Sequence, residues 1–200
     1  AYGYYGKTVT LYEEWNQTPD KTTLLRFAWY ARERKQDVNT ALKWLTTLTR
    51  ILIGIQNGKR VNDPDLQTVY VNLGLVFRTL NRPAHADGFL QAAIQLAPDT
   101  DRAQETKKLL SRNRTPLSLD DVSLVLTKSQ LAHLTIADLV SASPLAFKVT
   151  PQEAQVMASK GWPEVILDAM LKGGQSQTPQ SRGRDEIFKE WAEKDWQLVQ

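Results

Sequence analysis

The stretch VYVNLGLVFRTLNRPAHADGFLQAAIQLAPDT, residues 69–100, decides the fold of this 200-residue chain. Its apolar residues recur with helical spacing in two runs, which the sequence NRP at residues 81–83 separates. Asn81 is suited to end the first helix, and Pro83 is suited to begin the second because proline fits the first turn of a helix. Pro98 then ends the second helix. The stretch therefore predicts two antiparallel helices joined by a short turn, and it carries no group of residues typical of a catalytic site.

The spacing within this stretch resembles the tetratricopeptide repeat, a helix pair of about 34 residues with the pattern W-x2-L-G-x2-Y, then Ala, a large apolar residue and Pro. Counted from Gln67, every position of that pattern is in register, with Tyr, Phe and Leu in place of three of its usual residues. Small residues in the pattern allow two helices to approach closely. The residues that carry the match, and that we expect to pack the helices together, are Tyr70, Leu73, Gly74, Phe77, Ala86, Leu90, Ala93 and Pro98.

The preceding segment, LLRFAWYARERKQDVNTALKWLTTL at residues 24–48, resembles a degenerate copy of the same repeat. Phe27 and Ala28 take the Leu-Gly place, and we expect Trp29 and Trp44 to lie in the core. Helix starts are expected at Thr18 and Asp63, since each is followed by proline. Gly54 and the polar residues after it predict a loop, and no segment alternates for long enough to predict a strand.

Residues 115–173 predict a small bundle of short helices. The segments LSLDDV, LTIADL and VTPQEA share the pattern of a capping box, in which a hydroxyl and an acidic side chain three residues later satisfy the first amides of a helix. The predicted boxes pair Ser118 with Asp121, Thr135 with Asp138, and Thr150 with Glu153. A fourth helix is expected from Pro163 to Gly173. Residues 149–171 loosely resemble small helical modules of bacterial envelope lipoproteins.

The C-terminal segment, DEIFKEWAEKDWQLVQ at residues 185–200, predicts an amphipathic helix. Its expected docking residues are Ile187, Phe188, Trp191 and Leu198, which either bury against a partner subunit or fold back on the same chain. The expected fold is therefore all-α, with repeat-like antiparallel helix pairs, a small helical bundle and a C-terminal amphipathic helix. Its parts are an N-terminal segment (1–17), a repeat-like domain (18–112), a small helical module (115–173), a linker (174–184) and the tail helix (185–200).

The composition narrows the class of protein. The chain has no cysteine, so disulfides, thiolate metal sites and a cysteine nucleophile are excluded. A formal net charge of +3 is too small to favour nucleic acid or membrane as a partner. The chain begins AYGYYG without an initiator Met, so we expect either a removed leader or a fragment. Membrane association would then come through a partner or through that leader.

A search for chemistry finds no catalytic set. The sequence GIQNGKR at residues 54–60 has three residues between its glycines instead of four, and Arg where a phosphate-binding loop has Ser or Thr. His85 and His133 have no further ligand at metal-binding spacing. The sequence WPEVILDAM, residues 162–170, offers apolar residues where a DNA-recognition helix presents polar ones. We therefore expect no enzyme activity, no cofactor, no metal and no small-molecule substrate.

The repeat resemblance implies a concave groove that binds a partner segment. The groove is expected to be lined by the first helix of the repeat that matches the family pattern best, through Thr68, Val71, Leu75, Arg78 and Thr79. Val71 and Leu75 stand where a carboxylate-binding subset of the family has polar clamp residues, so an apolar or helical partner segment fits better. The expected function is a protein-binding adaptor or a structural subunit of a larger assembly. The favoured location is the periplasm or the bacterial outer membrane, with the cytoplasm as the alternative. A nucleic-acid-associated factor, through its basic clusters, and a glycan-binding envelope protein are the alternatives.

Overall fold

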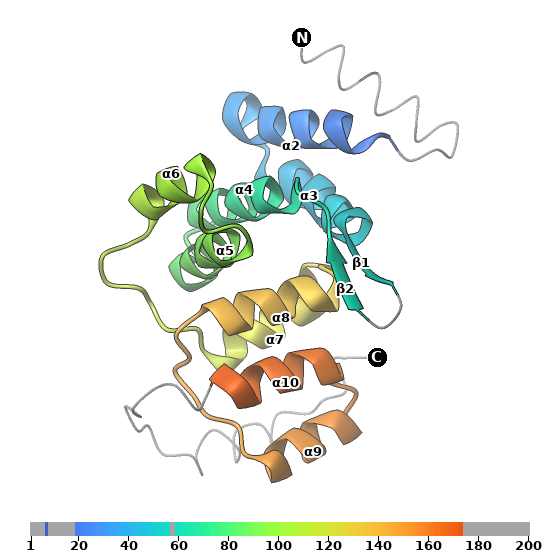
Figure 1. Cartoon of the computed structure of the whole chain (residues 1–200), viewed down its shortest axis with the longest axis vertical. Helices are drawn as coiled ribbons and strands as arrows, with labels where there is room; N and C mark the ends of the chain where they lie inside the picture. The colour runs from blue at the N-terminus through green and yellow to red at the C-terminus, as the bar shows by residue number, and fades with distance from the viewer. Residues whose placement is uncertain (1–6, 8–18, 57–58, 174–200) are drawn as a thin grey trace.

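The computed structural model describes residues 7, 19–56 and 59–173, and the fold of these residues is all-α (Figure 1). The elements are α2 (Lys21–Lys35), α3 (Val38–Leu52), β1 (Ile53–Gln56), β2 (Lys59–Asn62), α4 (Leu66–Thr79), α5 (Pro83–Leu96), α6 (Asp101–Leu109), α7 (Leu119–Lys128), α8 (His133–Ala142), α9 (Pro151–Ser159) and α10 (Glu164–Gly173). The N-terminal segment, Lys7 apart, lies outside the described residues. So do the linker and the tail helix, with Ile187, Phe188, Trp191 and Leu198.

The first helix pair is α2 and α3. The N-cap of α2 is Asp20, whose carboxylate accepts the Thr23 N–H at 3.0 Å, so the helix begins later than the predicted start at Thr18. Phe27 and Trp44 meet edge to face across the pair, with ring centroids 6.0 Å apart. Trp44 is buried, as predicted, but Trp29 is 45% exposed. The prediction that Trp29 lies in the core was wrong, because it stands on the side of α2 that no described helix covers fully.

The second pair, α4 and α5, matches the two predicted antiparallel helices and the short turn between them. Asn81 has a φ of 56°, the left-handed conformation that ends many helices and that Asn tolerates well. The predicted packing residues are buried, except Pro98, which follows the end of α5. A Cβ on Gly74 would lie 2.7 Å from Leu90 Cγ, so the close approach depends on glycine. The start of α4 is later than predicted, because the Asp63 carboxylate accepts the Asp65 N–H in a turn before the helix.

A two-stranded hairpin replaces the polar loop predicted after α3. β1 and β2 pair antiparallel, with Ile53 opposite Asn62 and Gly54 opposite Val61. The prediction that this segment has no strand was wrong. The sequence between the two strands is Asn57-Gly58, which is strongly favoured in two-residue hairpin loops, so the signal was present. The strands are too short for alternation of polar and apolar residues to reveal them.

The short helices of the second half begin at two of the three predicted capping boxes. The boxes of Ser118 with Asp121 and of Thr150 with Glu153 both form, at the starts of α7 and α9. The box predicted at Thr135 is wrong, because α8 begins at His133 and Thr135 lies fully buried inside it. Its intended partner, Asp138, instead accepts a hydrogen bond from the Tyr70 hydroxyl of α4.

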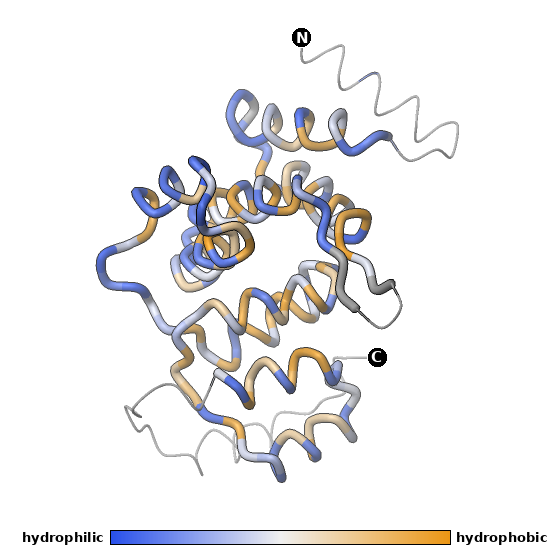
Figure 2. Tube along the Cα trace, viewed as in Figure 1, coloured by the Kyte–Doolittle hydropathy of each residue, from blue (hydrophilic) through white to orange (hydrophobic). Residues whose placement is uncertain are grey.

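The two halves share one hydrophobic core, which runs from Leu24 in α2 to Met170 in α10. α8 packs against α5 at Gly88, where an added Cβ would lie 2.4 Å from both Leu139 Cδ1 and Ser143 Oγ. Most described helices combine apolar and hydrophilic positions, whereas α6 is mostly hydrophilic (Figure 2).

Candidate partner-binding face

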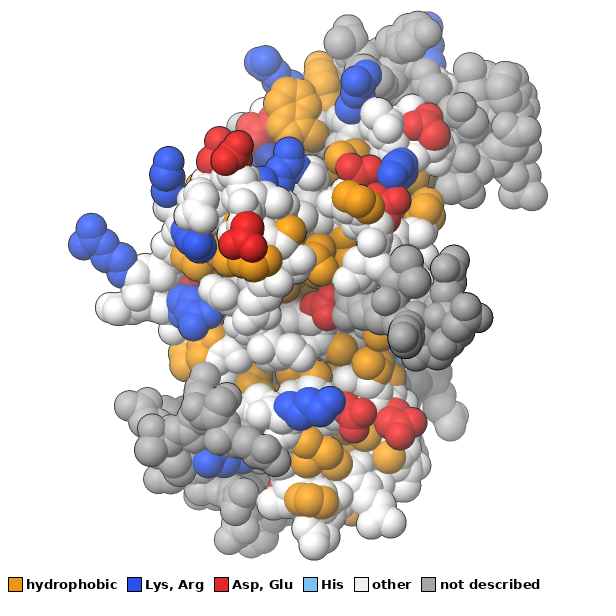
Figure 3. Space-filling model, viewed as in Figure 1, with side chains coloured by type: hydrophobic (Ala, Val, Ile, Leu, Met, Phe, Trp, Pro, Cys, Tyr) orange, Lys and Arg blue, Asp and Glu red, His pale blue; other side chains and the backbone are white. Residues whose placement is uncertain are grey.

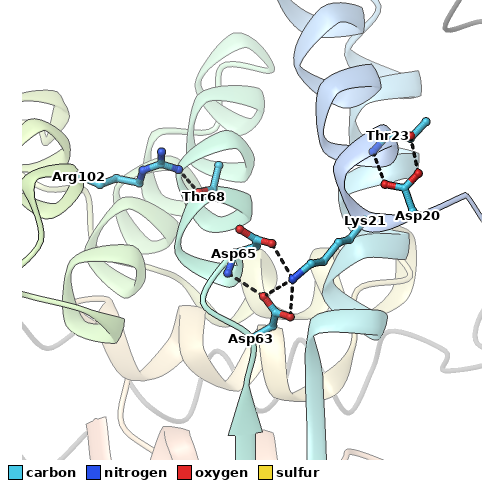
Figure 4. A network of polar contacts seen from close by, with 7 residues as sticks. All are labelled: Asp20, Lys21, Thr23, Asp63, Asp65, Thr68 and Arg102. Carbon is cyan, nitrogen blue, oxygen red and sulfur yellow. Dashed lines mark hydrogen bonds and ion pairs between the residues drawn. The ribbon is translucent and has the colours of Figure 1, made fainter.

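Three helices, α2, α4 and α6, lie side by side with α4 in the middle. At one end, Lys21 of α2 lies 2.8 Å from Asp63 and 2.9 Å from Asp65, both just before α4 (Figure 4). Hydrogen bonds to these two carboxylates raise the pKa of Lys21, and the bond from Lys21 lowers the pKa of Asp63. Further along, Arg32 Nη2 donates to Asn72 Oδ1 of α4 at 3.4 Å. The start of α2 therefore adjoins the start of α4, and the two helices run parallel.

The contacts between α4 and α6 follow the same direction. Near the start of both helices, Arg102 of α6 donates to the hydroxyl of Thr68, which lies 34 residues earlier in the chain (Figure 4). Near their ends, Arg78 Nη2 donates to the Leu109 carbonyl of α6 at 2.5 Å. All three helices therefore point the same way, and their corresponding turns are aligned.

The five residues predicted to line a groove are all on α4, and they are only partly covered. Thr68, Val71 and Leu75 are half-buried, and Arg78 and Thr79 are exposed. Arg78 also serves the fold, since its guanidinium lies 3.6 Å from the buried Asp87 as well as on the Leu109 carbonyl.

Sequence reasoning missed two apolar residues of this surface, one on each neighbouring helix. Trp29 lies one turn before Arg32, and Leu109 lies two turns after Arg102, so each is on the same side of its helix as a residue that contacts α4. Both are exposed, Trp29 at 45% and Leu109 at 36%. Leu109 could have been found, because it lies one repeat length, 34 residues, after Leu75. The same count does not lead from Leu75 back to Trp29, because the connection between α3 and α4 contains the β-hairpin and is longer than in the repeat pattern.

We call this surface the α2–α4–α6 face, and we define it by Trp29, Arg32, Thr68, Val71, Leu75, Arg102 and Leu109. Large apolar residues from three parallel helices lie on it. Elsewhere among the described residues, the exposed large apolar side chains are Ile51, Leu80 and Val156, which belong to different elements.

The charge on this part of the molecule is polarised along the helices. Because the three helices are parallel, their C-terminal turns form one edge, which we call the basic edge. It contains Arg32, Arg34, Arg78, Arg82, Lys107, Lys108 and Arg112. Figure 3 shows Lys and Arg side chains on the side where α6 ends. The opposite edge, at the helix starts, contains Asp20, Asp63, Asp65, Asp99 and Asp101 together with Lys21.

Among the described residues, carboxylates neutralise the basic edge only in part. Glu33 lies 2.7 Å from Arg32, and the buried Asp87 lies near Arg78. Burial lowers the pKa of Arg32, whose side chain is 14% exposed, and Glu33 opposes that shift. A cation in the last turn also stabilises its own helix through the helix dipole, so each of these charges has a local reason. Their alignment along one edge comes from the packing of the helices.

A second candidate site is a recess of about 210 Å³ between α5, α8 and the end of β2. Its lining residues are Asn62, Ala92, Gln95, Leu96, Asp138 and Ser141. Small-molecule sites usually occupy about 300 Å³ or more and are mainly apolar. The recess is smaller than that, and its one carboxylate is engaged by Tyr70, so it does not favour a small-molecule site.

Within residues 19–56 and 59–173, no three His, Asp or Glu side chains are grouped closely enough to hold a metal ion. None of the helices in these ranges is both long and apolar enough to cross a membrane. The chain matches no protein-family model, no curated protein and no solved structure.

Proposed function

We propose that the chain is a tetratricopeptide-like, non-enzymatic adaptor that binds a segment of a partner protein on the α2–α4–α6 face. The repeat assignment is supported by the register of Tyr70, Gly74 and Ala86, and by the parallel order of α2, α4 and α6. We further propose that it serves as a subunit of a larger assembly, because fewer than three full repeats make a short array.

One observation carries the proposal. Trp29 and Leu109 are exposed on either side of the half-buried Leu75, although the core elsewhere takes up most large apolar side chains. Exposed apolar residues that come together from separate elements are typical of protein-binding surfaces. Aromatic residues such as Trp contribute strongly to binding when a partner covers them.

The test compares capture of partner proteins by the wild-type chain and by the double variant Val71→Glu with Leu75→Lys. We expect the variant to keep its helical circular dichroism, because both side chains are only half-buried, and to lose the captured proteins. The matched control is Val156→Glu with Ile51→Lys, which places the same charges on exposed apolar residues of α9 and α3.

The proposal requires that the control retains the proteins that the face variant loses. Equal capture by all three chains would move the binding site away from the α2–α4–α6 face. Salt-sensitive retention of nucleic acid, or retention on cell-wall glycan, by all three chains would favour a different class of function.

A further inference from the structure

We propose that the α2–α4–α6 face and its basic edge bind an acidic amphipathic segment, and that this segment is residues 185–199 of the chain itself. The inference rests on the proposed function, because it assumes that this face is a binding surface. It adds the chemistry of the occupant and names it.

The α2–α4–α6 face and its basic edge favour an occupant that is both apolar and negatively charged. Trp29, Leu75 and Leu109 offer apolar contact from three helices. The basic edge lies at the end of the same helices, so an occupant that covers the apolar residues also passes close to the cations. A nucleic acid would use the cations but would leave the aliphatic residues without an apolar partner, whereas an acidic peptide with large apolar side chains satisfies both.

Some cations of the face and its edge are exposed to such a partner, whereas Arg32 and Arg78 already lie near carboxylates. Among the described residues, Arg102 donates to the uncharged Thr68 hydroxyl, and Lys107 donates to Gln104 at 3.3 Å. Arg34 is exposed. A carboxylate that reached these groups would form charge-assisted hydrogen bonds, which are stronger than those to neutral acceptors.

Residues 185–199 have the matching composition. The segment contains five carboxylates, at Asp185, Glu186, Glu190, Glu193 and Asp195, and two lysines, Lys189 and Lys194. Its net charge is therefore −5 + 2 = −3. The predicted docking residues Ile187, Phe188 and Trp191 have the spacing of one side of a helix.

The length of chain between the described body and this segment limits which copy of the face the segment can reach. Gly173 ends α10, and the segment begins at Asp185. A flexible connection of this length has a typical span of about 20 Å. Figure 1 shows α10 and α2 at opposite ends of the described body, so the arrangement favours docking on a neighbouring copy over docking on the same chain. A neighbouring copy can supply the same segment.

The absence of native cysteine makes disulfide trapping in the full-length chain a direct test. Ala192→Cys is combined with Thr79→Cys, an exposed position on α4 beside the basic edge. The matched control combines Ala192→Cys with Ser159→Cys, an exposed position on α9. Under mild oxidation we expect the Thr79 pair to form its disulfide at least about tenfold faster than the Ser159 pair. A monomeric product places the segment on its own chain, and a dimeric product places it on a neighbouring copy.

Charge reversal tests the basic edge separately. With the Thr79 pair in place, Arg34→Glu with Lys108→Glu should slow trapping at least about fivefold, and added salt should slow it in the unreversed chain. A synthetic peptide of residues 185–199 should compete with trapping, and a peptide of the same composition in scrambled order should compete less.

Equal trapping rates for the Thr79 and Ser159 pairs would overturn the inference. The Val71→Glu, Leu75→Lys variant would still test the adaptor function separately. If that variant lost partner capture while the trapping rates were equal, the adaptor function would be supported and only the proposed occupant would be wrong. Equal trapping with salt-sensitive binding of duplex DNA, lost on reversal of Arg34 and Lys108, would reassign the basic edge to nucleic acid.

Discussion

The helices α4 and α5 have similar apolar content, yet α5 is almost fully covered by other helices and one side of α4 remains open. α5 packs against α4, α6 and α8, and even its charged Asp87 is buried. α4 shares one helix pair with α5, yet its Val71 and Leu75 are only half-buried on a side that the described helices leave open. Apolar content alone therefore does not tell which side of a helix pair serves the core and which remains available to a partner.

Polar groups follow the same division. Toward the second half of the chain they form internal links, such as Tyr70 to Asp138 and His85 Nε2 to the Asp121 carbonyl at 3.0 Å. On the open side, Arg102 and Lys107 make contacts to neutral groups. One side is stabilised by the interactions it already has, and the other is the side that we propose binds a partner.

The largest expected difference between the two sides is in the cost of deleting an apolar side chain. Leu139→Ala removes a fully buried side chain from the α5–α8 contact and should lower the free energy of unfolding by about 2–5 kcal/mol. Leu75→Ala, the same change on the open face, should cost less than about 1 kcal/mol because the side chain remains partly in water. Urea unfolding followed by circular dichroism measures both, and equal losses would remove the distinction between the two sides.

A smaller loss is expected where α4 and α5 approach each other. Gly74→Leu would force a side chain into the space of Leu90 and the Ala86 carbonyl, and should destabilise by about 1–3 kcal/mol. Gly54→Leu is the matched control, since nothing lies within 4 Å of a Cβ at that position. A melting temperature unchanged by Gly74→Leu would refute the close packing of this helix pair.

Removing the hydroxyl of Ser118 or of Thr135 should change the free energy of unfolding by about 1 kcal/mol or less, with opposite signs. Ser118 caps α7, so Ser118→Ala should cost about 1 kcal/mol. The Thr135 hydroxyl is buried and has no hydrogen-bond partner among the described residues. Thr135→Val keeps its shape and should be neutral or should stabilise by up to about 1 kcal/mol. If thermal unfolding shows that both changes destabilise equally, the assignment of Thr135 as a buried residue instead of a cap is wrong.

The last prediction concerns pH and the covered side. Burial lowers the pKa of His85 below its ordinary value of 6.5, against opposing contributions from Asp121, and its ring stacks on Phe77 at 5.1 Å. The unfolded chain therefore binds a proton more readily than the folded chain, and stability should fall as the pH drops below about 6.5. Urea midpoints at pH 7.5 and pH 5.5 measure the effect.

The matched variants for this experiment are His85→Gln and His133→Gln, since His133 is exposed. The first should reduce the pH dependence between these two values, and the second should retain it. A dependence that survives in His85→Gln would assign the acid sensitivity to other groups.

The sequence by itself determined the helix pair α4–α5, the turn at Asn81, the packing residues from Tyr70 to Ala93 and two capping boxes. Each of these depends on residues within a few turns of one another, so local spacing and capping chemistry are sufficient to predict them. The β-hairpin was missed although Asn57-Gly58 indicated it, because four-residue strands leave almost no periodic pattern.

Tertiary structure alone decided which exposed residues belong together. Trp29 and Trp44 were both expected in the core, yet only Trp44 is buried, because the described helices leave the side of α2 that carries Trp29 partly open. Thr135 has the sequence of a cap, yet the packing of α8 on α5 and Asp138 on Tyr70 outweighs that local preference. The basic edge likewise exists because three parallel helices end on one side, so cations that are tens of residues apart in sequence produce one field.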